Sequence, residues 1–399
     1  MCRRPNFGEV PVSCEANEFM GDLFDSQSQR PPPGLIDNVQ LNLIPGIGPI
    51  NQRALLKYFG SAEKVLAASL AELGQVSGIG PKLARQIQEL RDPAAAEWEW
   101  STCCANDFRI LLHGSDDYPR GLREMDDAPL VLYCRGRIEP RDELAVGIVG
   151  SRRCTMYGRQ QAEKLGRSLA MAGVTIVSGM ARGIDAAAHR GALSAGGRTI
   201  AVSATGLLEI YPPEHKELAR EIAANGAVVS ENRLGQKPSG GLFPQRNRII
   251  SGLSHGVIII EANQKSGALH TARHAYEQGR EVMVLPANVD SIASVGSLNL
   301  LRDGATLIRH ADDVLEALGP LVAPVRLEGQ EEVRSPRELT LSEQELAVLN
   351  LVHTTPRPVD EVLRESDLET SRVLATLTVL EMKRMVRRLP GGMIMRVTN

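Results

Sequence analysis

The sequence predicts an α/β protein whose main domain is a Rossmann-like, doubly wound parallel sheet. Short β-branched runs, such as residues 174–177 and 257–260, alternate with longer helical stretches between residues 145 and 285. Continuous apolar runs of this length indicate strands that are buried on both faces, as in a parallel sheet covered by helices. Glycine is abundant, at 37 residues, which suits many tight turns between strands and helices.

Residues 1–38 are predicted to form a disordered tail. The segment is polar and rich in proline, the run Pro31–Pro32–Pro33–Gly34 closes it, and no apolar periodicity begins before Leu41. It has no apolar core of the kind that a secretory signal requires.

A short internal repeat lies within residues 39–105, which are predicted to form a helix-hairpin-helix-like helical domain. Residues 46–49 (GIGP) are echoed by residues 78–81 (GIGP), and a helical pattern follows each. A Gly-x-Gly turn between short helices resembles the helix-hairpin-helix, whose backbone N–H groups can approach a phosphate. The second copy has the small residue Ala84 four positions on, whereas Gln52 in the first argues against equally close helix packing. A helical packing domain and an auxiliary DNA contact are equally good interpretations.

The main domain is expected over residues 106–311. Strand-like runs at residues 108–112 and 130–133 lead into it. Buried strands are expected at residues 145–149, 174–177, 199–202, 227–229, 257–260 and 282–285, and helices at residues 158–172, 185–193, 215–224, 247–253 and 271–278. Ligands of such sheets bind beyond the carboxyl ends of the strands, so function is expected there.

A linker and a winged-helix domain are predicted to follow. Residues 312–340 combine prolines with a charged run, which is typical of a linker. In residues 341–399, Ser342 and Glu345 predict a capping box for a helix that ends near residue 352. Further helices are expected from about residue 358 and over residues 369–385, before a hairpin turned by Gly391 and Gly392. Three helices and a hairpin are typical of a winged helix.

Composition narrows the classes of function. No run of about 18 apolar residues occurs, so no membrane span or membrane partner is predicted. The net charge is −3, so any DNA site must be a local basic patch. The cysteines form no CxxC pair and have no metal-type spacing, which predicts reduced thiols, a cytoplasmic location, no metal and no cofactor. They are Cys2, Cys14, Cys103, Cys104, Cys134 and Cys154.

Loops that suit a phosphate follow the predicted strands. The first strand ends in Gly150, Ser151 and Arg152, which place a turn, a hydroxyl and a guanidinium at a helix N-terminus. These residues lack the glycine spacing of a dinucleotide site. The second strand is followed by the candidate anion-binding residues Ser178, Gly179, Arg182 and Gly183.

Asp185 and His189 follow that second loop on one helix face. We interpret them as structural support, with Asp185 capping the helix and His189 packing beneath the loop. The alternative is an acid–base pair with Ser178 as nucleophile. No catalytic residue is predicted, and we expect no chemistry.

The most nucleic-acid-like stretch contains Phe243, Arg246, Asn247 and Arg248. An aromatic ring in an exposed loop can stack a base, and neighbouring cations can hold phosphates. The alternative is that Phe243 fills core while the arginines pair with Glu231 and Glu261.

The fifth strand is followed by Ser266, Gly267 and Thr271, which again bring small residues and hydroxyls to a helix N-terminus. Several such loops along one sheet edge predict a groove, which fits a polyanion better than a single nucleotide.

These motifs, in this order, resemble the DprA/Smf family. The matching segments include residues 148–152 (IVGSR), 178–185 (SGMARGID), 211–212 (YP) and 243–250 (FPQRNRII), and the likeness covers about residues 110–310. The resemblance implies binding of single-stranded DNA without strong sequence preference, homodimerisation through the main domain, and loading of RecA recombinase during natural transformation. It also implies that Arg152 is a phosphate ligand and Phe243 a base-stacking ring. Ala204 and Ala287 replace glycines that are usual in the family.

Two other functions compete. A nucleotide-processing hydrolase related to cytokinin-activating phosphoribohydrolases would carry a Pro-Gly-Gly-x-Gly-Thr loop, where this chain has the glycine-poor residues 265–270 (KSGALH). A transcription regulator would need a basic recognition helix, but the third helix of the winged-helix domain has only Arg372 before Lys383.

Overall fold

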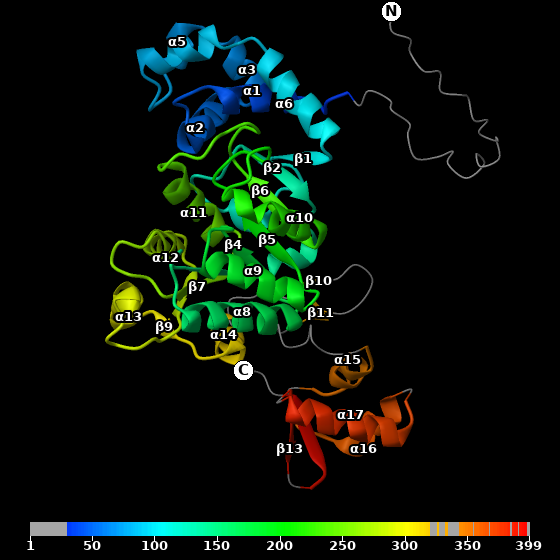
Figure 1. Cartoon of the computed structure of the whole chain (residues 1–399). Coiled ribbons are helices and arrows are strands. Elements are labelled where there is room, and N and C mark those ends of the chain that lie inside the picture. The colour runs from blue at the N-terminus through cyan, green and yellow to red at the C-terminus, as the bar shows by residue number, and fades with distance from the viewer. Residues whose placement is uncertain are drawn as a thin grey trace, which may run out of the picture.

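The three predicted domains follow one another along the chain in a computed structural model, shown in Figure 1. The structure describes residues 30–319, 325–326, 332–333, 343–353, 355–366, 368–383, 385–389 and 391–396. Residues 1–29 of the predicted tail, most of residues 320–342 and Ser342 of the predicted capping box lie outside the described residues.

The helical domain begins earlier than expected, because α1 starts at Leu35 and takes in the last residues assigned to the tail. Both Gly-x-Gly turns end in a proline at the first position of a helix, where its missing N–H costs nothing. The helices are α1(Leu35–Leu43), α2(Pro49–Phe59), α3(Ala62–Ala67), α4(Leu70–Leu73), α5(Pro81–Glu89) and α6(Ala94–Ala105).

Gln52, at the position that Ala84 holds in the second hairpin, is buried inside the helical domain. The side chain is 3% exposed, and its amide donates to the carbonyl of Ile47 at 3.3 Å and to the side-chain oxygen of Asn42 at 3.2 Å. A larger polar residue is tolerated at this position because its amide N–H groups are satisfied inside the domain.

The sheet of the α/β domain has the order β1-β2-β6-β5-β4-β3-β7-β8-β9. The pairings from β6 through β3 to β9 are parallel, which confirms the predicted sheet, and the lead-in strands β1 and β2 add an antiparallel edge. The strands are β1(Phe108–Leu112), β2(Val131–Gly136), β3(Ala145–Gly150), β4(Thr175–Ser178), β5(Thr199–Val202), β6(Gly226–Ser230), β7(Gly256–Ile260), β8(Glu281–Val284) and β9(Thr306–Leu307).

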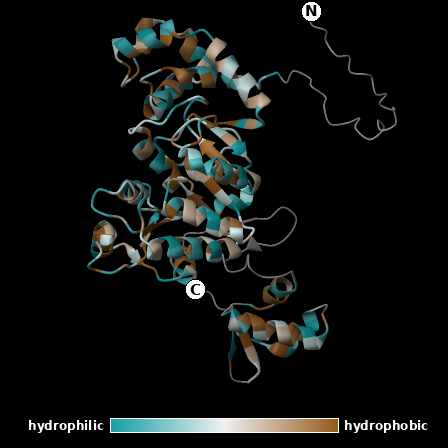
Figure 2. Ribbon diagram, viewed as in Figure 1, coloured by the Kyte–Doolittle hydropathy of each residue, from teal (hydrophilic) through white to brown (hydrophobic). Residues whose placement is uncertain are grey.

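Helices cover both faces of this sheet. Val146 and Ile148 of β3 belong to the core beneath α8, α9 and α14, whereas Ala145 and Val149 belong to the core beneath α11 and α12. Figure 2 shows hydrophobic residues on the strands of the sheet and, alternating with hydrophilic ones, along the helices. The helices are α7(Arg120–Arg123), α8(Met156–Met171), α9(Ile184–Ser194), α10(Lys216–Ala224), α11(Leu242–Gly252), α12(Ala268–Glu277), α13(Val295–Arg302) and α14(Ala311–Leu318), with short 3-10 turns at η1(Pro140–Glu143), η2(Pro213–His215) and η3(Ile292–Ser294). Because α14 ends at Leu318, the linker predicted from residue 312 begins later.

The helical domain and the sheet share hydrophobic core. Val39 and Leu41 of α1 lie in the same buried cluster as Tyr133 of β2 and Val228 of β6. Figure 1 shows the blue and cyan helices packed at one end of the α/β domain, beside β1 and β2. The two domains are therefore joined by packing as well as by the chain.

The winged-helix domain has a core of its own, which includes Val348, Val373, Leu377 and Ile394. Three helices and a small sheet of order β12-β14-β13 confirm the predicted architecture. Its elements are α15(Glu343–Asn350), β12(Arg357–Pro358), α16(Val359–Glu365), α17(Thr370–Met382), β13(Val386–Leu389) and β14(Met393–Arg396). Before them, β10(Val325–Arg326) and β11(Glu332–Val333) form a separate two-stranded sheet. Within the part of the chain that the structure describes, no helix has the length and apolar character needed to cross a membrane.

Candidate functional site

A pocket lies at the carboxyl edge of the sheet, where the topology places ligands. It encloses about 380 Å³, open solvent included. The lining residues come from the segments that follow β3, β4 and β5 and from the first turn of α11. They are Arg152, Gly179, Ala181, Arg182, Ala204, Thr205, Tyr211, Pro212 and Phe243.

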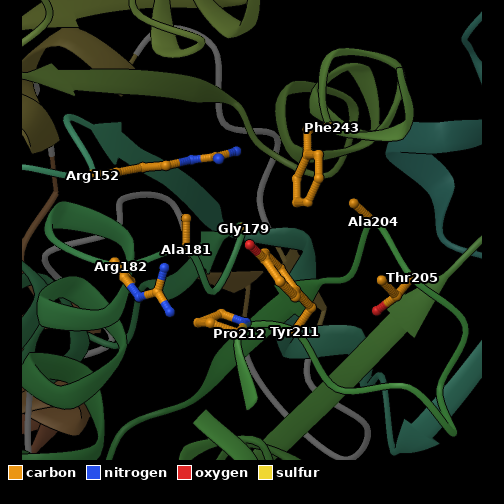
Figure 3. A pocket seen from close by; sticks show the side chains of 9 residues that line it. All are labelled: Arg152, Gly179, Ala181, Arg182, Ala204, Thr205, Tyr211, Pro212 and Phe243. Atoms are coloured by element: carbon orange, nitrogen blue, oxygen red, sulfur yellow. The ribbon is translucent and has the colours of Figure 1, made fainter. Parts of the chain in front are cut away.

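A cation and two aromatic rings meet in this pocket. The guanidinium carbon of the exposed Arg152 lies 4.7 Å from the centre of the Phe243 ring, which is a cation–π contact. The Tyr211 ring lies 5.7 Å from that of Phe243 and is inclined to it by 60°. Figure 3 shows Arg152 reaching across the pocket toward Phe243. Among the described residues, no carboxylate forms an ion pair with Arg152. The pocket therefore combines aromatic surface with a cation that has no ion-pair partner among the described residues.

Phe243 lies on a helix, where the sequence predicted an exposed loop. Helix α11 begins at Leu242 and not near residue 247, and Pro244 is tolerated in its first turn because no backbone N–H is needed there. The Phe243 ring is half-buried and faces the pocket. The early start of α11 also fixes where the following cations point.

Arg246 is held inside the protein, which corrects its prediction as a direct phosphate ligand. The side chain is 3% exposed, and its guanidinium donates to the carbonyls of Gly179, at 2.7 Å, and Val202. Burial lowers the pKa of Arg246 to about 10, an effect that the nearby Asp185 carboxylate opposes. A Cβ at Gly179 would lie 2.5 Å from this guanidinium, so a glycine is needed for Arg246 to reach the loop.

Arg248 and Asn247 are also turned inward. Arg248 forms ion pairs with Glu231 and, at 3.3 Å, with Asp127, while the Asn247 amide donates to the Gly267 carbonyl at 3.1 Å. The pairing of Arg248 with Glu231 matches the alternative interpretation. Glu261, the other expected partner, instead accepts from the Thr155 backbone N–H at 2.7 Å.

The loops after β3 and β4 approach each other too closely for side chains. Gly183 has φ +81°, and a Cβ there would lie 2.3 Å from the Ser151 carbonyl oxygen. A Cβ at Gly150 would lie 1.9 Å from the Ile260 carbonyl oxygen. The Ser151 hydroxyl accepts from the Arg153 N–H at 3.1 Å. Arg182 stands exposed at the pocket and pairs with Glu214.

Ser178, Asp185 and His189 are each bonded to other groups. The Ser178 hydroxyl donates to the Ile148 carbonyl at 2.6 Å. The Asp185 carboxylate accepts from the backbone N–H groups of Gly179 and Ala181, at 3.1 and 3.3 Å, and burial raises its pKa. Asp185 thus closes the loop after β4. It does not cap α9 as predicted, because it lies inside that helix, whose N-cap is Gly183 and which has no side-chain cap hydrogen bond.

His189 is fully buried and neutral. Its Nδ1 lies 2.6 Å from the Thr199 hydroxyl, and because that hydroxyl donates to the Ile176 carbonyl at 2.7 Å, the imidazole is the donor. Burial lowers the pKa of His189 to about 3. The imidazole is therefore buried and bonded to β5.

We expect His189 to make the protein less stable in mild acid. Its pKa is lower in the folded protein than in the unfolded chain, so the unfolded chain binds more protons and stability is lost as the pH falls from about 6.5 toward 3. Between about pH 7.0 and 5.5, the free energy of unfolding should fall by about 1 kcal/mol more in the wild type than in His189→Gln. Urea denaturation at both pH values measures this difference, and parallel pH dependences would contradict it.

Ser266, Gly267 and Thr271 lie outside the pocket. The Ser266 hydroxyl accepts from the Ala268 N–H at 3.3 Å at the start of α12, and the buried Thr271 hydroxyl has no protein partner among the described residues. The pocket therefore joins the segments after β3, β4 and β5 and does not include residues of the loop after β7.

The sequence analysis missed part of the pocket. Tyr211 was quoted only as a family motif, and Ala181 and Thr205 were not singled out. Tyr211, an aromatic residue in the segment after β5, was the signal that could have identified this side of the pocket. Met180 carried no signal, yet it has a left-handed backbone with φ 55°, and its carbonyl lies 2.9 Å from the Nδ1 atom of His215.

Comparisons with known proteins match each domain. The family model of DNA recombination-mediator protein A matches residues 109–319, the DprA winged helix domain residues 332–392, and the SAM-like helix-hairpin-helix tandem residues 40–91. Protein Smf of Synechocystis is 36% identical over 380 residues, or 87% of this chain and 95% of that protein.

Two solved structures are also similar. DNA processing protein A of Streptococcus pneumoniae is 34% identical, with a TM-score of 0.62 over 70% of this chain and 96% of that one. DNA processing protein A of Helicobacter pylori, whose structure concerns its mode of binding single-stranded DNA, is 36% identical, with a TM-score of 0.48 over 53% of this chain and 95% of that one.

Proposed function

Because this chain belongs to the DNA recombination-mediator protein A family, also called DprA or Smf, we propose that it binds single-stranded DNA at the carboxyl edge of its sheet. The observation that carries this proposal is the contact between Arg152 and Phe243 in an open pocket. A ring face stacks on a base, and a cation without a carboxylate partner binds a phosphate.

Single strands suit this pocket better than duplex. Stacking on Phe243 and Tyr211 needs a base whose face is free, and in a duplex both faces are covered by neighbouring bases. Arg182 adds a second cation at the pocket. Its ion pair with Glu214 is exposed, so exchange of Glu214 for a phosphate costs little.

Several of the other predicted site residues shape the pocket. Gly183 lets the loops after β3 and β4 approach each other, Gly150 lets β3 lie close to Ile260 of β7, and Gly179 leaves room for Arg246. Through its bonds to Gly179, after β4, and to Val202, the last residue of β5, Arg246 holds two walls of the pocket together. Asn247 and Arg248 fix α11, which carries Phe243.

We expect single-stranded oligonucleotides to bind more tightly than duplexes of the same sequence, because only the single strand can stack on the rings. The logarithm of the binding constant should fall linearly with the logarithm of salt concentration, with a slope of about −0.7 for each phosphate neutralised. Gel shifts or fluorescence anisotropy over a range of salt measure both quantities. Equal affinity for duplex, or affinity that does not depend on salt, would falsify the proposal.

We further propose that the protein acts by binding and not by catalysis. The bonds of Ser178, Asp185 and His189 to other groups support this, since an acid–base mechanism needs these side chains to reach one another. Release of product from nucleoside monophosphates or cleavage of DNA, abolished by Asp185→Ala, would contradict it.

The family further supports a role as a cytoplasmic homodimer that protects incoming DNA and loads RecA recombinase onto it during natural transformation. Light scattering measures the mass in solution. Assembly of RecA filaments on strands covered by single-strand-binding protein, with and without this chain, tests the loading.

A further inference from the structure

A buried carboxylate joins the helical domain to the loop that leads to Phe243. Glu99 lies on α6 and is 3% exposed. Its two carboxylate oxygens accept from the backbone N–H of Leu234, at 3.3 and 3.0 Å, across a separation of 135 positions in the sequence. Leu234 lies in residues 231–241, which we call the β6–α11 loop, and its side chain is fully buried.

Hydrophobic packing alone does not account for a carboxylate at this position. The other buried residues of α6 are Ala96 and Cys103, which pack without a polar group. Burial raises the pKa of Glu99, which means that its ionised form is costly there, and the hydrogen bond from Leu234 partly offsets that cost. Since buried charge is tolerated where it satisfies a donor, we assign Glu99 the role of holding the Leu234 N–H.

The β6–α11 loop is bonded in turn to the segment that follows β5. The Leu208 N–H donates to the Leu234 carbonyl at 3.1 Å, and the Gly206 N–H donates to the Gln236 carbonyl at 3.0 Å. A Cβ at Gly206 would lie 2.1 Å from the Leu234 carbonyl oxygen, so the two segments are in direct backbone contact. Displacement of Leu234 therefore displaces residues 206–208.

Those residues continue into one wall of the pocket. Ala204 and Thr205 line it, and the Asn232 side chain of the β6–α11 loop donates to the Ala204 carbonyl at 3.2 Å. At its other end the loop runs into α11 and Phe243. The wall after β5 and the stacking ring thus depend on one loop, and Glu99 holds the middle of that loop.

We propose that Glu99 is a positioning residue for the DNA pocket, through which the helical domain sets the distance between the β5 wall and Phe243. The inference rests on the single-stranded DNA binding proposed above. Glu99 does not touch the DNA in this proposal, so its loss should change stacking in the pocket without removing a counterion-releasing contact.

The test compares Glu99→Ala and Glu99→Gln with Glu97→Gln, which changes an exposed carboxylate on the same helix. Binding of a single strand that contains 2-aminopurine reports affinity and stacking, and hydrogen exchange reports the Leu234 amide. We expect Glu99→Ala to lower affinity about fivefold with an unchanged salt slope, because an orphaned N–H frees the loop. Glu99→Gln should lose about twofold, since a neutral acceptor binds the N–H more weakly. Glu97→Gln should match the wild type.

Hydrogen exchange decides whether loss of the Glu99–Leu234 contact or a disturbed overall fold lowers the affinity of the variants. Faster exchange at Leu234 and residues 206–208, together with weaker 2-aminopurine quenching and an unchanged melting temperature, supports the proposal. Faster exchange at Leu234 in either Glu99 variant, with affinity and quenching at wild-type levels, overturns it. If Glu99→Ala does not fold, Glu99→Gln gives the same comparison. A wild-type protein that binds no single-stranded DNA would instead refute the proposed function itself.

Discussion

Replacing Arg152 with alanine is expected to weaken binding of single-stranded DNA by about 1.5–3 kcal/mol, or about 10- to 150-fold, which is the range for a hydrogen bond to a charged group. The salt slope should become shallower by about 0.7, because one phosphate contact fewer releases one counterion fewer. Titrations at several salt concentrations measure both effects. Arg152 is exposed and has no ion pair among the described residues, so its loss should leave the melting temperature nearly unchanged.

Arg141→Ala is the matched control for that variant. Arg141 is also an exposed arginine, but it lies in η1 and pairs with Glu139 outside the pocket. If both variants lost affinity equally, the effect would be one of net charge and Arg152 would not be a phosphate ligand. Arg152→Lys keeps the charge but loses the planar fork, so it should recover the salt slope more fully than the affinity.

Replacing Phe243 with alanine is expected to weaken binding by about 1–3 kcal/mol, or about 5- to 150-fold, because a base loses its stacking surface. The salt slope should stay close to that of the wild type, since no charge is removed. Phe243→Trp should retain binding through a larger ring. Anisotropy titrations over the same salt series separate this result from that of Arg152→Ala.

Thermal melting is the control for Phe243, whose ring is half-buried against Tyr211. Truncation of a fully buried phenylalanine costs roughly 3–5 kcal/mol of stability. A Phe243→Ala protein that melts much lower but binds DNA normally while folded would assign the ring to the core. Because Arg152 and Phe243 touch, the double variant should lose less affinity than the sum of the two single losses.

Much of the α/β domain could be predicted because its strands are short apolar runs without competing patterns. β5 was placed at its observed bounds, Thr199–Val202, and β3, β4, β6, β7 and β8 within one residue at each end, whereas the two-residue strand β9 was not predicted. The antiparallel pairing of β2 with β6 could not be predicted, because strand direction depends on a long-range contact that leaves no periodic signal.

The site was predicted less completely, because the direction of a side chain depends on where its helix starts. The sequence placed the start of α11 near residue 247, since glycines and a proline precede it. The helix begins at Leu242, which turns Arg246 and Arg248 inward. Composition could not separate these arginines from Arg152, because what distinguishes them is burial. Glu99 gave no signal, as its partner is a backbone N–H far along the chain.

The contact between Arg152 and Phe243 places a guanidinium where the proposed function places a base. The guanidinium covers a ring face that an arriving base needs, and an exposed cation–π contact of this kind is worth about 0.5–1 kcal/mol. In the proposed binding mode, each nucleotide that stacks displaces the guanidinium, and the guanidinium returns to the ring when that nucleotide leaves. Binding and release would then exchange contacts of similar energy, which lowers the free-energy cost of release.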